Sequence, residues 1–136
     1  MTAQNDIVTA ARNYLGTPFH HQARVKGVGI DCAGLLVCVA RDLGLQHYDV
    51  QGYSRVPSGA EFERHLDANL DKISAIEPGC ILLMAFDSDP QHVAIATSLT
   101  TIIHAHFEVR KCVEHDLDSV WTSRIRSIYR FRGLLP

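Results

Sequence analysis

The chain reads Gly29-Ile30-Asp31-Cys32-Ala33-Gly34-Leu35 where a polar loop gives way to a helical pattern. Beyond this stretch and as far as Gly44, apolar residues recur three or four positions apart, namely Leu35, Leu36, Val39, Ala40 and Leu43. Aspartate is a preferred residue type at helix N-termini, and glycine often ends a helix. The pattern therefore predicts a buried helix that begins at Cys32, with Asp31 as its N-cap.

Cys32 stands where a helix N-terminus favours a thiolate, because exposed amide groups and the positive end of the helix dipole stabilise negative charge. Gly29 and Gly34 leave room for a substrate backbone or a facing strand. The alternative is a buried core cysteine, which fits Cys38 and Cys80 better because both lie in apolar stretches. These local features leave both interpretations of Cys32 open.

The rest of the chain divides into helices followed by strands. Helical spacing covers residues 6–15 and 60–70, and the polar, glycine-containing residues 20–29 indicate a loop near Cys32. Short apolar runs then predict strands over 80–86, 92–97, 102–106, 111–117 and 125–131, of which the fourth is the weakest. Helices followed by an antiparallel meander define an α+β fold, and we expect one domain over residues 1–136.

Composition excludes several classes of partner. Hydrophobic residues make up 46% of the chain, charged residues 21%, and the formal net charge is −2, as in ordinary globular proteins. The sequence has neither the basic runs that bind nucleic acids nor an apolar run of the roughly 20 residues that span a bilayer. We therefore expect no nucleic acid and no membrane as partner. The polar start lacks a signal-peptide pattern, so we expect synthesis in the cytoplasm and free thiols.

A cysteine nucleophile needs an imidazole within hydrogen-bond reach, and the imidazole needs a third polar group to orient it. His92 follows a predicted turn at residues 87–90, where its side chain can face a cleft. His104 lies on the next predicted strand, so strand pairing could place the two imidazoles side by side. This spacing favours His92 as the base and His104 as its orienting group.

The remaining histidines allow a second interpretation. His104 and His106 share one face of a strand, so zinc could be held by Cys32, His92, His104 and His106, although no familiar zinc signature has this spacing. We rank that site lower and expect no metal and no cofactor. His20 and His21 lie in the loop near Cys32 and could join the site, whereas the polar or amphipathic surroundings of the others predict surface histidines at His47, His65 and His115.

Four segments together resemble the NlpC-type cell-wall endopeptidases, a compact branch of the papain-like cysteine peptidases. Tyr14-Leu15-Gly16-Thr17-Pro18-Phe19 is similar to the family's opening Tyr-x-Gly-x-Pro-Tyr, and residues 29–34 are similar to its Gly-x-Asp-Cys-Ser-Gly. Gln91-His92-Val93-Ala94-Ile95 resembles its His-Val-Gly-Ile, and Ile103-His104-Ala105 resembles the segment with the third polar residue. Their order and spacing agree with the family over nearly the whole chain.

The resemblance implies a papain-like fold in which the nucleophile helix packs on an antiparallel sheet. It implies Cys32 as nucleophile, His92 as general base and His104 as orienting group, acting on the stem peptide of peptidoglycan. The family usually cuts between the side-chain carboxyl of D-glutamate and the diamino acid. Substrate contacts are implied for Phe19, Asp31, Ala33 and Gly34. Ala33 and Phe19 lack the hydroxyls of the family's Ser and Tyr, whereas Asp31 is retained and could pair with a substrate ammonium group.

Residues 114–131, with Glu114-His115-Asp116-Leu117-Asp118 and Trp121, resemble single-domain members from phages, prophages and gene-transfer agents. Those members act as tail-associated lysins, which implies tail proteins as partners and a location on a tail or virion that acts at the cell wall. Two other functions stay open: a thiol amidase or acyltransferase with a non-wall substrate, and a non-catalytic tail-assembly or wall-binding module. A binding module would have no need of Cys32, His92 and His104 together.

Overall fold

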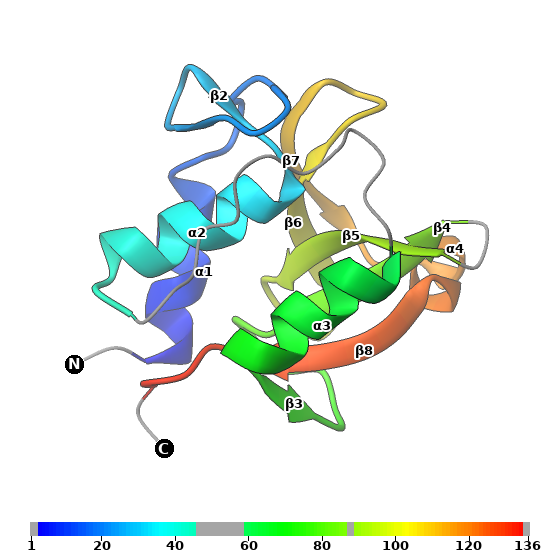
Figure 1. Cartoon of the computed structure of the whole chain (residues 1–136). Helices are drawn as coiled ribbons and strands as arrows, with labels where there is room; N and C mark the ends of the chain where they lie inside the picture. Colours follow the sequence, from blue (N-terminus) through cyan, green and yellow to red (C-terminus); the bar gives the residue numbers. More distant parts are fainter. Residues whose placement is uncertain (1–2, 46–58, 87–88, 135–136) are drawn as a thin grey trace.

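A six-stranded antiparallel sheet organises the computed structural model, which describes residues 3–45, 59–86 and 89–134 (Figure 1). Its strand order is β3-β8-β4-β5-β6-β7. The strands are β3 (Asp71–Ile73), β4 (Ile81–Phe86), β5 (Asp89–Ala96), β6 (Thr101–His106), β7 (Lys111–Asp116) and β8 (Ile125–Arg130). Strands β4 to β7 form the predicted meander. The last strand does not extend it, because β8 returns to pair with β4 and with the unpredicted β3.

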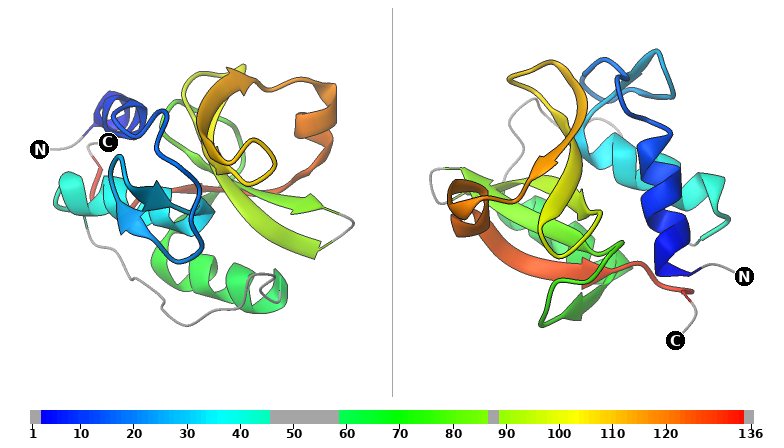
Figure 2. Two further views of the ribbon diagram at one scale, coloured as in Figure 1. Left: turned by 90° about the horizontal axis from the view of Figure 1, so that it is seen from above. Right: turned by 180° about the vertical axis from the view of Figure 1, so that it is seen from behind.

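Three helices pack against one face of this sheet (Figures 1 and 2). They are α1 (Gln4–Arg12), α2 (Cys32–Asp42) and α3 (Gly59–Asn69). Their apolar residues share one buried cluster with odd-numbered residues of β4 and β5, including Leu83, Val93 and Ile95. The predicted α+β architecture, with the helix that begins at Cys32 packed on an antiparallel sheet, is confirmed.

The opposite face of the sheet is also covered. Even-numbered residues of the same strands, including Leu82, Met84 and Ala94, form a second buried cluster. Residues 117–128 pack on it and contain the short helix α4 (Ser119–Ser123), which was not predicted. Because both faces are buried, β4 reads as a continuous apolar run and not as an alternating pattern.

Helix α2 begins where the sequence predicted. The Asp31 carboxylate accepts a hydrogen bond of 2.8 Å from the Gly34 N–H, which caps the helix N-terminus. Leu35 and Val39 are fully buried on the face that meets the core. The helix ends at Asp42, and Gly44 follows with a φ of +69°, a conformation that glycine adopts without steric cost.

Helix α1 is shorter than the pattern over residues 6–15 predicted. After Arg12, the amide groups of Tyr14 and Leu15 bond to carbonyls three residues earlier, at 3.0 and 3.2 Å, so the chain tightens into turns. Tyr14 is nevertheless buried, and its hydroxyl donates to Asp42 of α2 at 2.5 Å. The apolar spacing that predicted a longer helix therefore reflects burial beyond the helix end.

The predicted loop over residues 20–29 contains a small hairpin of β1 (Arg24–Val25) and β2 (Gly29–Ile30). The residues just before this hairpin bond to the rest of the fold. The Phe19 N–H donates to the carbonyl of Arg110, which directly precedes β7, at 2.8 Å, and the His20 N–H donates to the Ile30 carbonyl of β2 at 3.0 Å. In Figure 1 the hairpin lies beside the β6–β7 turn. The segment before Cys32 is therefore tied to the sheet.

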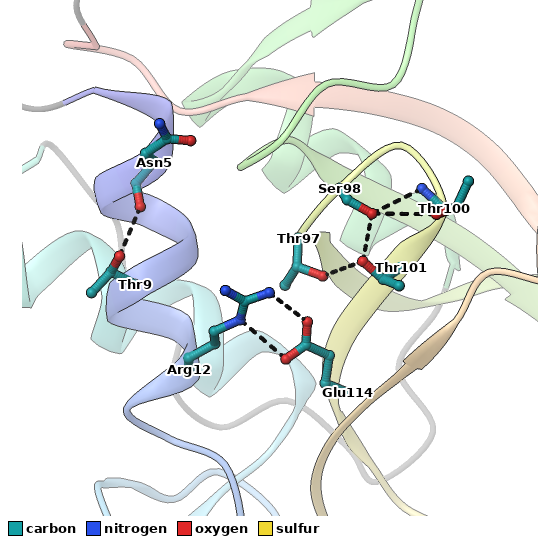
Figure 3. Close-up of polar contacts among 8 residues, drawn as sticks. All are labelled: Asn5, Thr9, Arg12, Thr97, Ser98, Thr100, Thr101 and Glu114. Atoms are coloured by element: carbon teal, nitrogen blue, oxygen red, sulfur yellow. Dashed lines mark hydrogen bonds and ion pairs between the residues drawn. The ribbon is translucent and has the colours of Figure 1, made fainter.

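An ion pair joins the helical layer to β7 (Figure 3). Nε and Nη2 of Arg12 donate to the two carboxylate oxygens of Glu114 at 3.1 and 2.9 Å. Figure 3 also shows the β5–β6 turn, where the hydroxyls of Thr97 and Thr101 lie 2.7 Å apart. The Arg12–Glu114 pair is thus a direct side-chain link between α1 and β7.

The other predicted elements agree with the structure to within a few residues. Helix α3 was predicted as 60–70, and strands β4 to β8 as the five apolar runs. The polar stretch with Tyr53 and Pro57 and part of the predicted turn at 87–90 lie outside the described residues. Among the described segments, no helix is long and apolar enough to cross a bilayer.

Candidate active site

Cys32 lies at the first position of α2, against the point where strands β5 and β6 separate. These strands pair at Ile95 with Ile103 and at Ala96 with Ile102. Towards the start of β5, the backbone amide of Val93 instead lies near the Cys32 thiol and, like the Ala33 amide, acts to lower its pKa. Cys32 is partly exposed, while the other three cysteines are buried. The structure therefore brings the predicted nucleophile beside the strand that carries His92.

The thiol of Cys32 is not held as a thiolate in the way the helix N-terminus alone predicted. Burial of the sulfur among protein atoms, followed by the nearby charge of Asp31, raises its pKa to about 12. The bonds from the Val93 and Ala33 amides act in the opposite direction but are outweighed. In the resting site Cys32 is a neutral thiol, so nucleophilic attack requires a base to take its proton.

Asp31 is buried in a network that shapes the start of α2. One carboxylate oxygen accepts from Gly34 and from Arg24 Nη1 at 2.8 and 2.9 Å, and the other accepts from the Gln22 N–H at 2.8 Å. The side chains of Asp31 and Arg24 are only 4% and 10% exposed. This carboxylate therefore holds the β1–β2 hairpin against α2. Its predicted contact with a substrate ammonium group stays a prediction.

The other three positions predicted to contact substrate, Gly34, Ala33 and Phe19, differ in their surroundings. Gly34 is buried, and a Cβ added there would lie 2.6 Å from the Ala23 carbonyl oxygen, so the close approach of the hairpin requires glycine. Ala33 is partly exposed next to Cys32. Phe19 packs at the edge of the core, with its ring edge-on to Phe107 at 6.4 Å between centroids.

The predicted pairing of His92 with His104 has a direct counterpart in the structure. Nε2 of His92 lies 2.6 Å from Nδ1 of His104, a hydrogen bond between the start of β5 and the middle of β6. Both side chains are buried, with 8% and 0% of their surfaces exposed. The two imidazoles are thus neighbours, as the strand pattern predicted.

Both of these histidines are neutral at physiological pH. Burial is the main cause that lowers the pKa of His92 to about 3, with smaller contributions from the charges of His106 and Arg124. Burial, followed by the neighbouring His92, His106 and His115, also lowers the pKa of His104. A neutral imidazole can accept a proton, so His92 has the protonation state that a general base needs.

The depressed pKa of His92 predicts acid sensitivity of the fold. Between its ordinary pKa of 6.5 and its folded value of about 3, the unfolded chain binds a proton that the folded chain does not. The free energy of unfolding therefore falls as pH falls through this window, by up to about 1.4 kcal/mol per pH unit for one proton. In urea denaturation at several pH values from 7 to 4, His92→Asn should lose stability less steeply than the wild type. Equal slopes would contradict the burial of a neutral imidazole.

The sequence missed two residues of this site. His115 was predicted as a surface histidine, but its Nε2 lies 2.8 Å from Nε2 of His104, on the far side from His92. Trp121 of α4 packs among the histidines, with ring centroids 4.9 Å from His104 and 5.2 Å from His115. Strand β7 places His115 opposite Ile102, on the face that carries His104. A firm register for the weak strand 111–117 would have revealed the contact.

The other histidines in the described part of the chain make different contacts. His106 stacks on His104 with centroids 4.9 Å apart, and its Nδ1 accepts from the Glu108 N–H at 3.4 Å. His20 packs against Gly29, and His21 contacts the Gln22 side chain at 3.2 Å. His47 lies outside the described residues. Within the described part of the chain, no group of three or more His, Cys, Asp or Glu residues is arranged to hold a metal ion.

Comparisons with known proteins bear on the fold. No family model matches the chain, and no curated protein matches it significantly. Among solved structures, NlpC2 from Trichomonas vaginalis has a TM-score of 0.73 at 18% identity, over 96% of this chain and 47% of that one. A lipoprotein-like member of the NLP/P60 family from Staphylococcus aureus has a TM-score of 0.71 at 18% identity, over 98% and 42%.

An isolated domain shows the same likeness. The NlpC/p60 domain of the peptidoglycan hydrolase SagA has a TM-score of 0.66 at 23% identity, over 96% of this chain and 100% of that domain. The fold is therefore the α+β fold of NlpC/P60 domains, with N-terminal helices on a six-stranded antiparallel sheet. The chain spans less than half of the first two proteins, and at these identities the likeness establishes the fold alone.

Proposed function

We propose that the protein is a cysteine peptidase that hydrolyses an amide bond in the stem peptide of peptidoglycan. The observation that carries the proposal is the placement of Cys32 at the start of α2, close enough to the amide that follows His92 for that amide to lower its pKa, with His92 bonded to His104. Nucleophile, base and orienting group are the three parts of a thiol-hydrolase site. The likeness to the domain of a peptidoglycan hydrolase supports the substrate class.

In the proposed mechanism, His92 accepts the thiol proton as the Cys32 sulfur attacks the carbonyl carbon of the scissile amide. The resulting oxyanion meets backbone amide donors at the start of α2, for which the N–H of Cys32 is the candidate. The imidazolium of His92 then gives its proton to the leaving amine, and a thioester remains on Cys32. Water, deprotonated by His92, hydrolyses the thioester and restores the thiol.

The proposed bond joins the side-chain carboxyl of D-glutamate to the diamino acid. Asp31 supports recognition of a free amino end by its charge, although its oxygens already hold Arg24 and Gln22. Ala33 offers no hydroxyl to such an end, so we expect looser recognition there than a serine would give. Phe19 contributes an apolar edge near the hairpin.

We also propose that the protein is located on a phage or prophage tail, with tail proteins as its partners. It is supported by the resemblance of residues 114–131 to tail-associated lysins. An amidase or acyltransferase acting on a non-wall substrate uses the same thiol chemistry, so the identity of the product separates these functions.

Purified muropeptides provide the test. The protein should release products whose masses correspond to cleavage between D-glutamate and the diamino acid, detected by mass spectrometry after incubation at neutral pH. Protein alkylated beforehand with iodoacetamide should release none, because the thiol is blocked. Intact muropeptides in both samples, from several wall chemotypes, would refute the hydrolase proposal, and cleavage at another bond would correct its substrate.

A further inference from the structure

Three imidazoles form one row of hydrogen bonds that ends on the backbone. Nε2 of His92 lies 2.6 Å from Nδ1 of His104, and Nε2 of His104 lies 2.8 Å from Nε2 of His115. At the far end, Nδ1 of His115 lies 2.9 Å from the carbonyl oxygen of Asp116. We infer that His115 is a positioning residue that sets the tautomer of His92 through His104. This inference rests on the proposed role of His92 as base.

The carbonyl oxygen of Asp116 decides which nitrogen donates and which accepts in every hydrogen bond of the row. A carbonyl oxygen only accepts, so Nδ1 of His115 carries the hydrogen. A neutral imidazole has one N–H, so Nε2 of His115 accepts from Nε2–H of His104. The Nδ1 of His104 then accepts from Nε2–H of His92. Each neutral ring is thereby left with one possible tautomer.

The nitrogen left without a hydrogen is Nδ1 of His92, and because Nε2 is bonded to His104, it is the ring nitrogen available to accept the thiol proton. His104 alone could not enforce this state, because a neutral imidazole can present either a donor or an acceptor to its neighbour. If His104 carried its hydrogen on Nδ1, His92 would carry its own on Nδ1 and could not accept the thiol proton there. His115 removes that alternative by accepting from His104.

The surroundings keep this row in place. Trp121 lies against His104 and His115, and the Arg124 guanidinium lies 4.4 Å from the centre of the Trp121 ring. Burial of His92 and His104 disfavours a second hydrogen on either ring. Packing against Trp121 and burial therefore hold His92 and His104 in place as neutral imidazoles.

The test measures the tautomer directly. In protein labelled with ¹⁵N-histidine, the ring nitrogens of His92 should show Nε2 protonated and Nδ1 unprotonated at neutral pH. In His115→Phe the same spectrum should show mixed tautomers of His92, and kcat should fall about 10-fold, with little change in KM.

His106→Phe is the matched control, since His106 stacks on His104 without a hydrogen bond to it. It should leave the tautomer of His92 unchanged. The inference is overturned if wild-type His92 carries its hydrogen on Nδ1, or if His115→Phe leaves the spectrum of His92 as in the wild type. These spectra need no substrate, so they decide the inference even if no muropeptide is cleaved, an outcome that would count against the proposed function alone.

Discussion

Cys32→Ala is expected to lower kcat/KM for stem-peptide hydrolysis by at least about 10⁴-fold, because no other group can form the thioester. Among the four cysteines, Cys32 is the one that is not buried, and it is the one whose pKa is lowered by the backbone amide that follows His92. The measurement is the rate of product release from purified muropeptides, with circular dichroism to show that the variant is folded.

Cys80→Ala is the matched control for this loss. Cys80 is buried in the second apolar cluster, so the variant also removes a thiol from the interior. It should keep the rate within a few-fold of the wild type while losing some stability to the cavity. If Cys32→Ala retained the wild-type rate, or if both variants lost activity to the same extent, Cys32 would not be the nucleophile.

Asp31→Ala is expected to lower the free energy of unfolding by about 3–5 kcal/mol. The change removes the N-cap of α2 and leaves the buried guanidinium of Arg24 without its carboxylate, which is the costly way to break a buried ion pair. It also removes the acceptor of the Gln22 N–H, at a residue whose φ of +62° places it in the left-handed region. Urea denaturation measures the loss.

Arg12→Ala breaks an exposed pair in the same protein and should cost about 1 kcal/mol or less. The double variant Asp31→Ala with Arg24→Met should be more stable than Asp31→Ala alone, because it no longer buries a guanidinium that has lost the Asp31 carboxylate. A loss for Asp31→Ala no larger than that for Arg12→Ala would contradict the structural role given to this carboxylate.

Local patterns were sufficient for most of the fold. The cap at Asp31 and the apolar spacing that follows it fixed helix α2, and bounded apolar runs located β4 to β8. What they could not supply was strand order: nothing in residues 125–131 indicates that β8 pairs with β4 in place of β7. The pattern also extended α1 through Tyr14, because burial by neighbouring elements resembles helical periodicity.

The site was predictable where its chemistry is local and not where it depends on packing. The pairing of His92 with His104 followed from two adjacent strands. The part played by His115 depends on the register of a strand with a weak pattern, and the contact of Trp121 depends on an unpredicted helix. The pKa of the Cys32 thiol could not be predicted locally either. The helix N-terminus alone predicts a lowered pKa, but burial by the tertiary structure raises it.

The position of Cys32 at the start of α2, next to Val93 of β5, also has a consequence for folding kinetics. The proposed nucleophile comes from the helical first part of the chain and the imidazoles from the later sheet, so they meet only through contacts between residues distant in sequence. Such contacts form after chain loops close, and they are typical of late stages of folding. A molecule in which the meander has formed but α2 has not yet docked would have the row of imidazoles without a thiol to activate. Hydrolysis by this site would therefore be confined to completely folded molecules, and a nascent or partly unfolded chain would be inert.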